Sequence, residues 1–305
     1  MDLSVVIVNY KTRDLTLQTL TSVFEAIKTA DAKAKTVKVE VILVDNASAD
    51  DTPKIVRRRF PETQVIASKK NLGFAGGNNL GIKSASGRYV LLLNSDTLVN
   101  KDTFTKMIKF MDENPKVGLS TCKVRLFAGG IDPASHRGFP TPWAALTYYS
   151  GLEKLWPKSR LFGQYHQGWK DLKTTHEIDT PVGAFFFLRR EALKQTGNLD
   201  EAFFMYGEDI DLAFRIKSAG WEIIYTPITS ITHLKGASGL NKKVQNQLTA
   251  EAKAIRIRTV TNFFEAMKLF YQKHYRKRYP FVLAWLVWSG IDLLKTLRIV
   301  SIKLK

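Results

Sequence analysis

The sequence predicts an α/β fold with a mostly parallel sheet flanked by helices, and two kinds of segment support this. Residues 3–8, 39–44 and 89–93 are continuous runs rich in β-branched side chains or leucine. Such runs are typical of strands buried on both faces. Segments with the period of an amphipathic helix lie between them. At 305 residues, of which 45% are apolar, the chain is long enough to bury a full core.

Three helices are expected in this first part of the chain. Residues 13–30 carry an apolar stripe, residues 50–60 form a second helix that Asp50 or Asp51 would cap, and residues 75–84 form a third. In parallel sheets a ligand binds beyond the carboxyl ends of the strands, so the residues after each run matter most. A polar residue there is commonly a cap or turn former, but three clusters at successive strand ends favour a binding crevice: Asn9 and Tyr10; Asp45 and Asn46; Asn94, Ser95 and Asp96.

A glycine-rich stretch at residues 71–81 precedes the third strand. Its Gly76, Gly81 and Lys83 miss the P-loop spacing by one inserted residue. No dinucleotide-binding glycine pattern follows Val8. The pattern therefore disfavours a P-loop kinase or a nicotinamide-dependent enzyme.

Six short motifs follow one another in an order that resembles family 2 glycosyltransferases with the GT-A fold. The likeness extends over about residues 3–239 and is strongest to bacterial rhamnosyltransferases of cell-envelope polysaccharides. It implies a Rossmann-like GT-A domain over residues 1–240, with a mixed, mostly parallel sheet, and an inverting transferase that uses a nucleoside-diphosphate sugar. The motifs are VVIVNY (5–10), VDNAS (44–48), NLGFAGGNN (71–79), LNSDT (93–97), GEDIDL (207–212) and HLKGAS (233–238).

The resemblance assigns a metal site and a catalytic base. Asp96 stands at the last position of the family's Asp-x-Asp motif and His233 at its histidine motif, so both would bind a divalent Mg2+ or Mn2+ ion. Such an ion stabilises negative charge on a leaving diphosphate. Asn94 replaces the first acid of that motif and brings no charge. The base would be Asp209, with Glu208 as a supporting or alternative candidate.

The donor pocket is assigned in the same way. Asp45 resembles the acid that hydrogen-bonds a pyrimidine base, which leaves dTDP-rhamnose and UDP-sugars open as donors. A tight structural turn is the competing explanation for the glycine-rich loop. The other residues expected to bind the donor are Val8, Asn9, Tyr10, Asn71, Gly73, Asn78, Asn94 and Ser95.

Aromatic residues crowd into residues 128–178, where the regular pattern fades. Glycines and prolines among them indicate an irregular insertion. Sugar rings stack on aromatic faces, so this insertion could shape the acceptor side, and a second small core explains the same residues equally well.

The last part of the chain, residues 241–305, is predicted to be a basic, amphipathic helical region. From residue 235 onward the sequence holds +12 of the net charge of +18. Basic residues at 273–278 precede an apolar stretch at 281–290, which is shorter than the roughly 20 residues of a spanning helix. One interpretation is a helix on an anionic membrane surface. The other is a helical hairpin packed on the main domain.

Together these observations predict a peripheral enzyme on the cytoplasmic face of the inner (plasma) membrane that acts on a glycan or lipid-linked glycan. Nothing at the N-terminus resembles an export signal, and the single Cys122 excludes an intramolecular disulfide and a thiolate metal site. Two rival classes are a nucleic-acid-binding protein and a catalytically inactive, membrane-attached scaffold. The first leaves the crevice acids unexplained, and the second would have lost the metal and base positions, so no nucleic-acid partner is expected.

Overall fold

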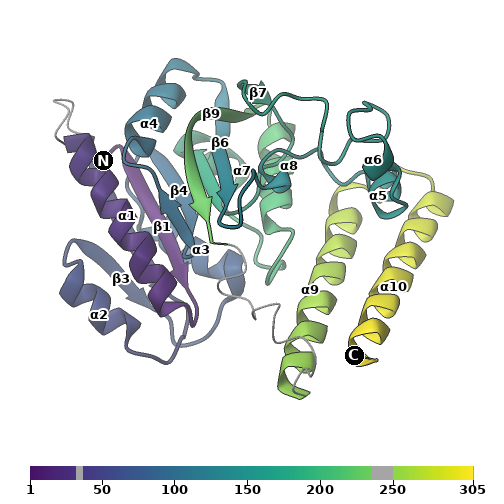
Figure 1. Cartoon of the computed structure of the whole chain (residues 1–305), viewed down its shortest axis with the longest axis horizontal. Coiled ribbons are helices and arrows are strands. Elements are labelled where there is room, and N and C mark those ends of the chain that lie inside the picture. The colour runs from purple at the N-terminus through teal and green to yellow at the C-terminus, as the bar shows by residue number, and fades with distance from the viewer. Residues whose placement is uncertain (32–36, 235–249, 305) are drawn as a thin grey trace.

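The computed structural model describes residues 1–31, 37–234 and 250–304, and a nine-stranded sheet runs through it (Figure 1). The strand order is β3-β2-β1-β4-β8-β6-β9-β5, and β7 pairs with β9 at the side of this path. The strands are β1 (Leu3–Asn9), β2 (Val39–Asp45), β3 (Thr63–Ala67), β4 (Tyr89–Asn94), β5 (Thr97–Val99), β6 (Val117–Leu126), β7 (His176–Glu177), β8 (Phe185–Arg189) and β9 (Glu222–His233).

Strand directions confirm the prediction of a mixed, mostly parallel sheet flanked by helices. β1 is parallel to β2 and β4, and β2 is parallel to β3. β8 runs antiparallel to both β4 and β6, and β6 is parallel to β9. Only two residues separate β4 from β5, too few for a crossover between parallel strands. β5 therefore turns away from β4 and pairs antiparallel with β9.

Helices cover both faces of the sheet. One face packs against α1, α2 and α4 through a core that includes Leu20, Val56 and Phe104. The other packs against α3, α7 and α8 through residues such as Ile82 and Leu212. These helices are α1 (Arg13–Asp31), α2 (Thr52–Arg59), α3 (Gly73–Ser84), α4 (Thr103–Glu113), α7 (Arg190–Thr196) and α8 (Glu208–Ser218).

The predicted helices form with small shifts at their starts. α2 begins at Thr52, whose backbone N–H donates to the Asp50 carboxylate (2.9 Å), whereas the Asp51 side chain makes no cap hydrogen bond. α3 begins at Gly73, two residues earlier than predicted. Gly73 has φ +73°, and a Cβ there would lie 2.2 Å from the Phe204 carbonyl oxygen. Glycine is required because another loop packs against its backbone.

The segment between β6 and β8 contains short elements only. They are a 3-10 helix at Pro133–Ser135, α5 (Pro142–Tyr149), α6 (Leu152–Leu155) and β7. Trp143 donates to the Leu161 carbonyl oxygen (2.8 Å), and the rings of Trp156 and Phe162 lie 5.3 Å apart. A small aromatic cluster thus orders this segment, while a role on the acceptor side stays a prediction.

Helices α9 (Ala250–His274) and α10 (Phe281–Lys303) form an antiparallel hairpin that packs on the outer side of α8 (Figure 1). Phe270 and Tyr275 of the hairpin contact the Phe214 ring of α8, with centroids 5.8 Å apart in each case. Among the described residues, no helix is long and apolar enough to cross a membrane. The hairpin interpretation is confirmed, and membrane association stays a prediction.

Candidate active site

The first part of the site lies where β1 and β2 end side by side. Asn9 is the register partner of Asp45, and its side-chain amide donates to Asp45 (2.7 Å) and to Ser48 (2.9 Å). Asp45 also accepts from the Ser48 backbone N–H (3.3 Å). Each carboxylate oxygen has two lone pairs, so Asp45 can still accept a ligand N–H. Of the neighbouring predicted residues, Val8 is half-buried and Tyr10 is exposed.

A second loop is held against this edge by Asn46. Its side chain donates to Asn71 (3.1 Å) and to the Gly73 carbonyl oxygen (2.9 Å), and it accepts from the Leu72 backbone N–H (2.9 Å). Asn78 is buried and donates to a carbonyl oxygen one turn earlier in α3 (2.9 Å). The amides of Asn71 and Asn78 therefore order the loop and helix, and their donor-binding roles stay predictions.

The third part is the turn that follows β4. Ser95 is hydrogen-bonded to Thr12 (3.0 Å), which ties the turn to the start of α1. In the antiparallel pair of β5 and β9, Thr97 lies opposite His233. This register brings His233 Nε2 to 3.2 Å from Asp96 Oδ1. The buried side-chain oxygen of Asn94 has no hydrogen-bond partner among the described residues, so it can accept from a ligand.

Asp132 was not predicted, and it faces His233 from the other side. Its carboxylate lies 3.9 Å from His233 Nδ1, and both side chains are buried. Burial lowers the pKa of His233, but Asp132 and Asp96 outweigh this effect and raise the pKa to about 9. Two carboxylates around one imidazole make this a place that favours positive charge.

The donor set at Asp96 and His233 fits a divalent cation. The carboxylate oxygen and imidazole nitrogen suit Mn2+, and a carboxylate with substrate phosphates suits Mg2+. No group of three or more His, Cys, Asp or Glu side chains that could hold an ion occurs within the described ranges. The rest of the predicted histidine motif, residues 235–238, lies outside the described residues.

The predicted base, Asp209, lies in the first turn of α8 beside the same edge. A Cβ on Gly183 would be 3.6 Å from the Asp209 Cβ, and the adjacent Ala184 accepts a hydrogen bond from the Asn94 backbone N–H (3.2 Å). Asp209 Oδ2 pairs with the Arg137 guanidinium at 3.1 Å. The structure therefore links the acidic motif of α8 to the turn after β4 through residues 183–184.

Glu208 differs from its neighbour in environment. It is buried, its Oε2 has no hydrogen-bond partner among residues that the structure describes, and burial together with the Asp209 charge raises its pKa above that of a free glutamate. Glu208 therefore keeps its proton to a higher pH than a solvent-exposed glutamate does. The assignment of the base to Asp209, with Glu208 as the supporting or alternative candidate, stays a prediction. Asp211 pairs with Arg215, four residues further along α8 (2.8 Å).

Backbone strain gathers in the loops that carry these residues. In the described part of the chain, non-glycine residues with positive φ include Lys11, Ala47, Ala49 and Tyr206, in the loops that follow β1 and β2 and before α8. Left-handed conformations cost energy for such residues and are enriched at functional sites.

A family model provides the deciding comparison. The model described as "Glycosyl transferase family 2" matches residues 4–197. The chain belongs to this family. The matched residues include the donor edge and the turn after β4, so the family assignment covers the first three parts of the site. Asp209 and His233 lie beyond the matched range.

Two curated relatives of this family 2 chain are rhamnosyltransferases. N-acetylglucosaminyl-diphospho-decaprenol L-rhamnosyltransferase of Mycobacterium tuberculosis is 26% identical over 215 residues, which cover 66% of this chain and 68% of that protein. Rhamnosyltransferase WbbL of Escherichia coli K12 is 25% identical over 213 residues, which cover 63% of this chain and 76% of that protein.

Solved structures of glycosyltransferases share the fold. Mannosyltransferase PcManGT from Pyrobaculum calidifontis, in complex with GDP-Man and Mn2+, has a TM-score of 0.58 at 18% identity and covers 99% of this chain and 72% of its own. S. aureus TarS 1-349, in complex with UDP-GlcNAc, has a TM-score of 0.54 at 17% identity. The match covers 91% of this chain and 74% of that one. The predicted GT-A fold of a family 2 glycosyltransferase is confirmed.

Proposed function

We propose that this family 2 glycosyltransferase is an inverting enzyme. It moves a sugar from dTDP-rhamnose or a UDP-sugar to a hydroxyl of a glycan or lipid-linked glycan in cell-envelope polysaccharide synthesis. The observation that carries the proposal is the contact of Asp96 with His233 (3.2 Å) at the edge where Asp45 and Asn94 also end their strands. Acids for three tasks are thus available along one edge. Asp45 would recognise the nucleobase, Asp96 would hold a cation and Asp209 would accept a proton.

The donor would lie across this edge. Asp45, buried and held by Asn9, accepts an N–H of uracil or thymine, which purines do not present in the same place. The side-chain oxygen of Asn94, which has no hydrogen-bond partner in the described part of the chain, accepts a hydroxyl of the donor or a metal-bound water. Asp96 and His233 would hold Mg2+ or Mn2+, which when bound stabilises negative charge on the leaving diphosphate.

Asp209 would act as the base. It takes the proton of the acceptor hydroxyl while the acceptor oxygen forms its bond to the anomeric carbon. The bond from that carbon to the diphosphate oxygen breaks, and its electron pair leaves with the diphosphate. Attack from the face opposite the diphosphate inverts the configuration. The raised pKa of Glu208 limits the negative charge that this residue adds beside Asp209.

Acceptor and donor sugar are proposed from the relatives. The Mycobacterium tuberculosis relative is named for L-rhamnose transfer to N-acetylglucosaminyl-diphospho-decaprenol, and the Escherichia coli relative is a rhamnosyltransferase. These names favour dTDP-rhamnose as the first donor to test and a diphospho-lipid as the acceptor.

A panel of UDP-, dTDP- and GDP-sugars tests the function, with metal-dependent binding and released nucleotide as the readouts. We expect pyrimidine donors to bind and Asp209→Asn to lower turnover by at least about 100-fold, since general bases contribute about that much or more. Donor affinity should stay within a few-fold. No binding of any donor would support the inactive-scaffold alternative, and full turnover in Asp209→Asn would exclude Asp209 as the base.

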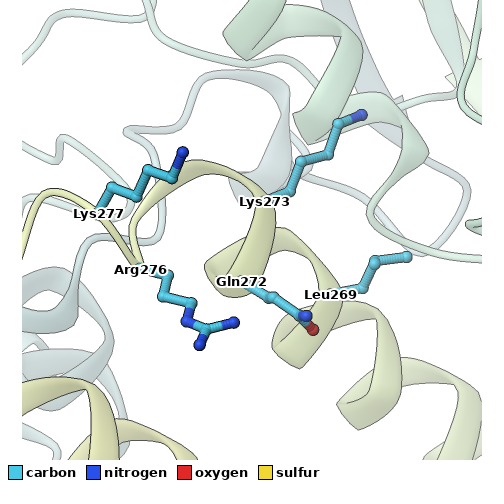
Figure 2. Close-up of a pocket in the computed structure, with 5 residues that line it drawn as sticks. All are labelled: Leu269, Gln272, Lys273, Arg276 and Lys277. Atoms are coloured by element: carbon cyan, nitrogen blue, oxygen red, sulfur yellow. The ribbon is translucent and has the colours of Figure 1, made fainter. Parts of the chain in front are cut away.

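We also propose that the α9–α10 hairpin rests on the cytoplasmic face of the inner (plasma) membrane. Apolar side chains of α10 remain exposed, among them Phe281 (81%) and Trp285 (57%). A cavity of about 590 Å³ lies around the end of α9, which Figure 2 shows. Among described residues, the cationic side chains of Arg276 and Lys277 have no acidic partner, so lipid phosphates could bind there. The cavity is lined by Leu269, Gln272, Lys273, Arg276 and Lys277.

Sedimentation with vesicles tests this surface. The wild-type chain should bind phosphatidylglycerol vesicles and bind phosphatidylcholine weakly. Charge reversal of Arg276 and Lys277 to Glu should lower binding by about 10-fold or more, because each basic residue near such a surface contributes about 1 kcal/mol. The matched control reverses Arg57 and Arg58 on α2, away from the hairpin (Figure 1). Equal loss in both variants would indicate only a net-charge effect.

A further inference from the structure

The structure assigns to Arg137 the role of positioning Asp209 relative to the donor edge, an inference that rests on the proposed role of Asp209 as base. Arg137 belongs to the irregular segment between β6 and β8, where no regular pattern marks it. It is 9% exposed, so its charge is almost fully removed from water. A buried guanidinium requires partners, and here those partners are parts of the active site.

One nitrogen of Arg137 joins the base to the turn region. Its Nη2 donates to Asp209 Oδ2 (3.1 Å) and to the Pro181 carbonyl oxygen (2.9 Å). Pro181 leads into Ala184, whose carbonyl oxygen accepts from the Asn94 backbone N–H (3.2 Å). The guanidinium therefore sets the distance between the base and the turn that carries Asp96.

The arginine is itself fixed along its length. Its backbone N–H donates to the Thr180 carbonyl oxygen (3.1 Å), and its carbonyl oxygen accepts from the Asp179 and Thr180 N–H groups (3.0 and 3.1 Å). Its Nη1 donates to the Tyr165 hydroxyl oxygen (3.3 Å). The other Asp209 oxygen accepts the Ile210 backbone N–H (2.9 Å), so both oxygens are oriented. A planar, doubly anchored cation holds one carboxylate geometry, which a lysine reproduces only in part.

The test compares Arg137→Gln and Arg137→Lys with wild type in hydrolysis of dTDP-rhamnose, or of UDP-N-acetylglucosamine if the panel selects it. We expect turnover to fall about 100-fold in Arg137→Gln, the size expected when a reacting group is misplaced by about 1 Å. Arg137→Lys should keep part of the turnover that Arg137→Gln loses, and added guanidinium should restore turnover in Arg137→Gln. The KM for the donor should change less than about threefold in both variants. Arg189→Gln is the control, because Arg189 is held by the Val117 and Met111 carbonyl oxygens (2.8 and 2.6 Å) at the opposite end of β8. It should lower the melting temperature and leave turnover unchanged.

A double-mutant cycle separates this inference from the proposed function. In an Asp209→Asn background, Arg137→Gln should have no further effect on turnover, because the group that it positions is gone. Additive losses, or Arg137→Gln at wild-type turnover, would overturn the positioning role while leaving Asp209 as base. If Arg137→Gln does not fold, wild-type turnover in Arg137→Lys together with no guanidinium effect would overturn it. An active Asp209→Asn enzyme would instead refute the base assignment itself.

Discussion

Replacing Asp211 by asparagine tests how the α9–α10 hairpin is attached to α8, the helix that carries Asp209. Asp211 is completely buried in α8 and pairs with Arg215 (2.8 Å), Lys273 (2.7 Å) and His274 (2.7 Å). Burial acts to raise the Asp211 pKa, but these partners outweigh it and lower the pKa from 3.8 to about 2. Since one pKa unit corresponds to about 1.4 kcal/mol, the shift contributes roughly 2.5 kcal/mol to stability at neutral pH.

The variant should lose about 2 to 4 kcal/mol in the free energy of unfolding at pH 7, because cations also lose their buried partner. A lowered carboxyl pKa stabilises the fold above the unfolded pKa, and this contribution disappears as the pH falls from about 4 toward 2. The difference in the free energy of unfolding between wild type and variant, measured by urea denaturation, should therefore become smaller over that pH range.

Asp292→Asn is the control for this experiment. Asp292 pairs with Lys268 (2.5 Å) and Lys295 (3.4 Å) in the same hairpin, but its side chain is 49% exposed to solvent. Exposed pairs contribute little, so no measurable loss is expected. A loss below about 0.5 kcal/mol in Asp211→Asn, well under the value from the pKa shift, would refute the reasoning. A loss of constant size down to pH 2 would do the same.

Three further changes probe the site itself. Gly73→Ala would place a methyl group 2.2 Å from the Phe204 carbonyl oxygen at φ +73°, so we expect a stability loss of about 1 to 3 kcal/mol by urea denaturation. His233→Ala should raise the Mn2+ concentration needed for dTDP binding by about 10-fold or more in calorimetric titrations, and an unchanged requirement would remove His233 from the ligand set. Asp45→Asn should weaken dTDP binding by about 10-fold, the effect of one charge-assisted hydrogen bond, with wild-type affinity counting against the base-pocket assignment.

Local patterns were enough to predict the strand ends that form the donor edge. Buried β-branched runs and helical periods reflect burial along short segments, and Asn9, Asp45 and Asn94 follow directly from where those runs stop. The start of α3 was placed two residues late. Gly73, the first residue of this helix, has a left-handed backbone conformation and packs against Phe204. No local sequence pattern indicates that contact.

The irregular segment between β6 and β8 was the main source of missed residues. Arg137 and Asp132 sit in turns and short elements without periodicity, so nothing in their neighbours distinguished them from other charged residues. Their importance depends on the side chains that they reach. A charged residue predicted to be buried in an aromatic-rich insertion would have been the available signal.

The sequence by itself determined three buried strands and three helices of the first part of the chain, the chemical groups at the ends of those strands and the apolar and basic character of the last helices, because these depend on neighbouring residues. Tertiary structure decided which groups meet. The antiparallel pairing of β5 with β9 brings Asp96 into contact with His233. Arg137 contacts Asp209 although the two residues are far apart in the sequence. Packing of α9 on α8 likewise depends on complementary surfaces that exist only once both helices are folded.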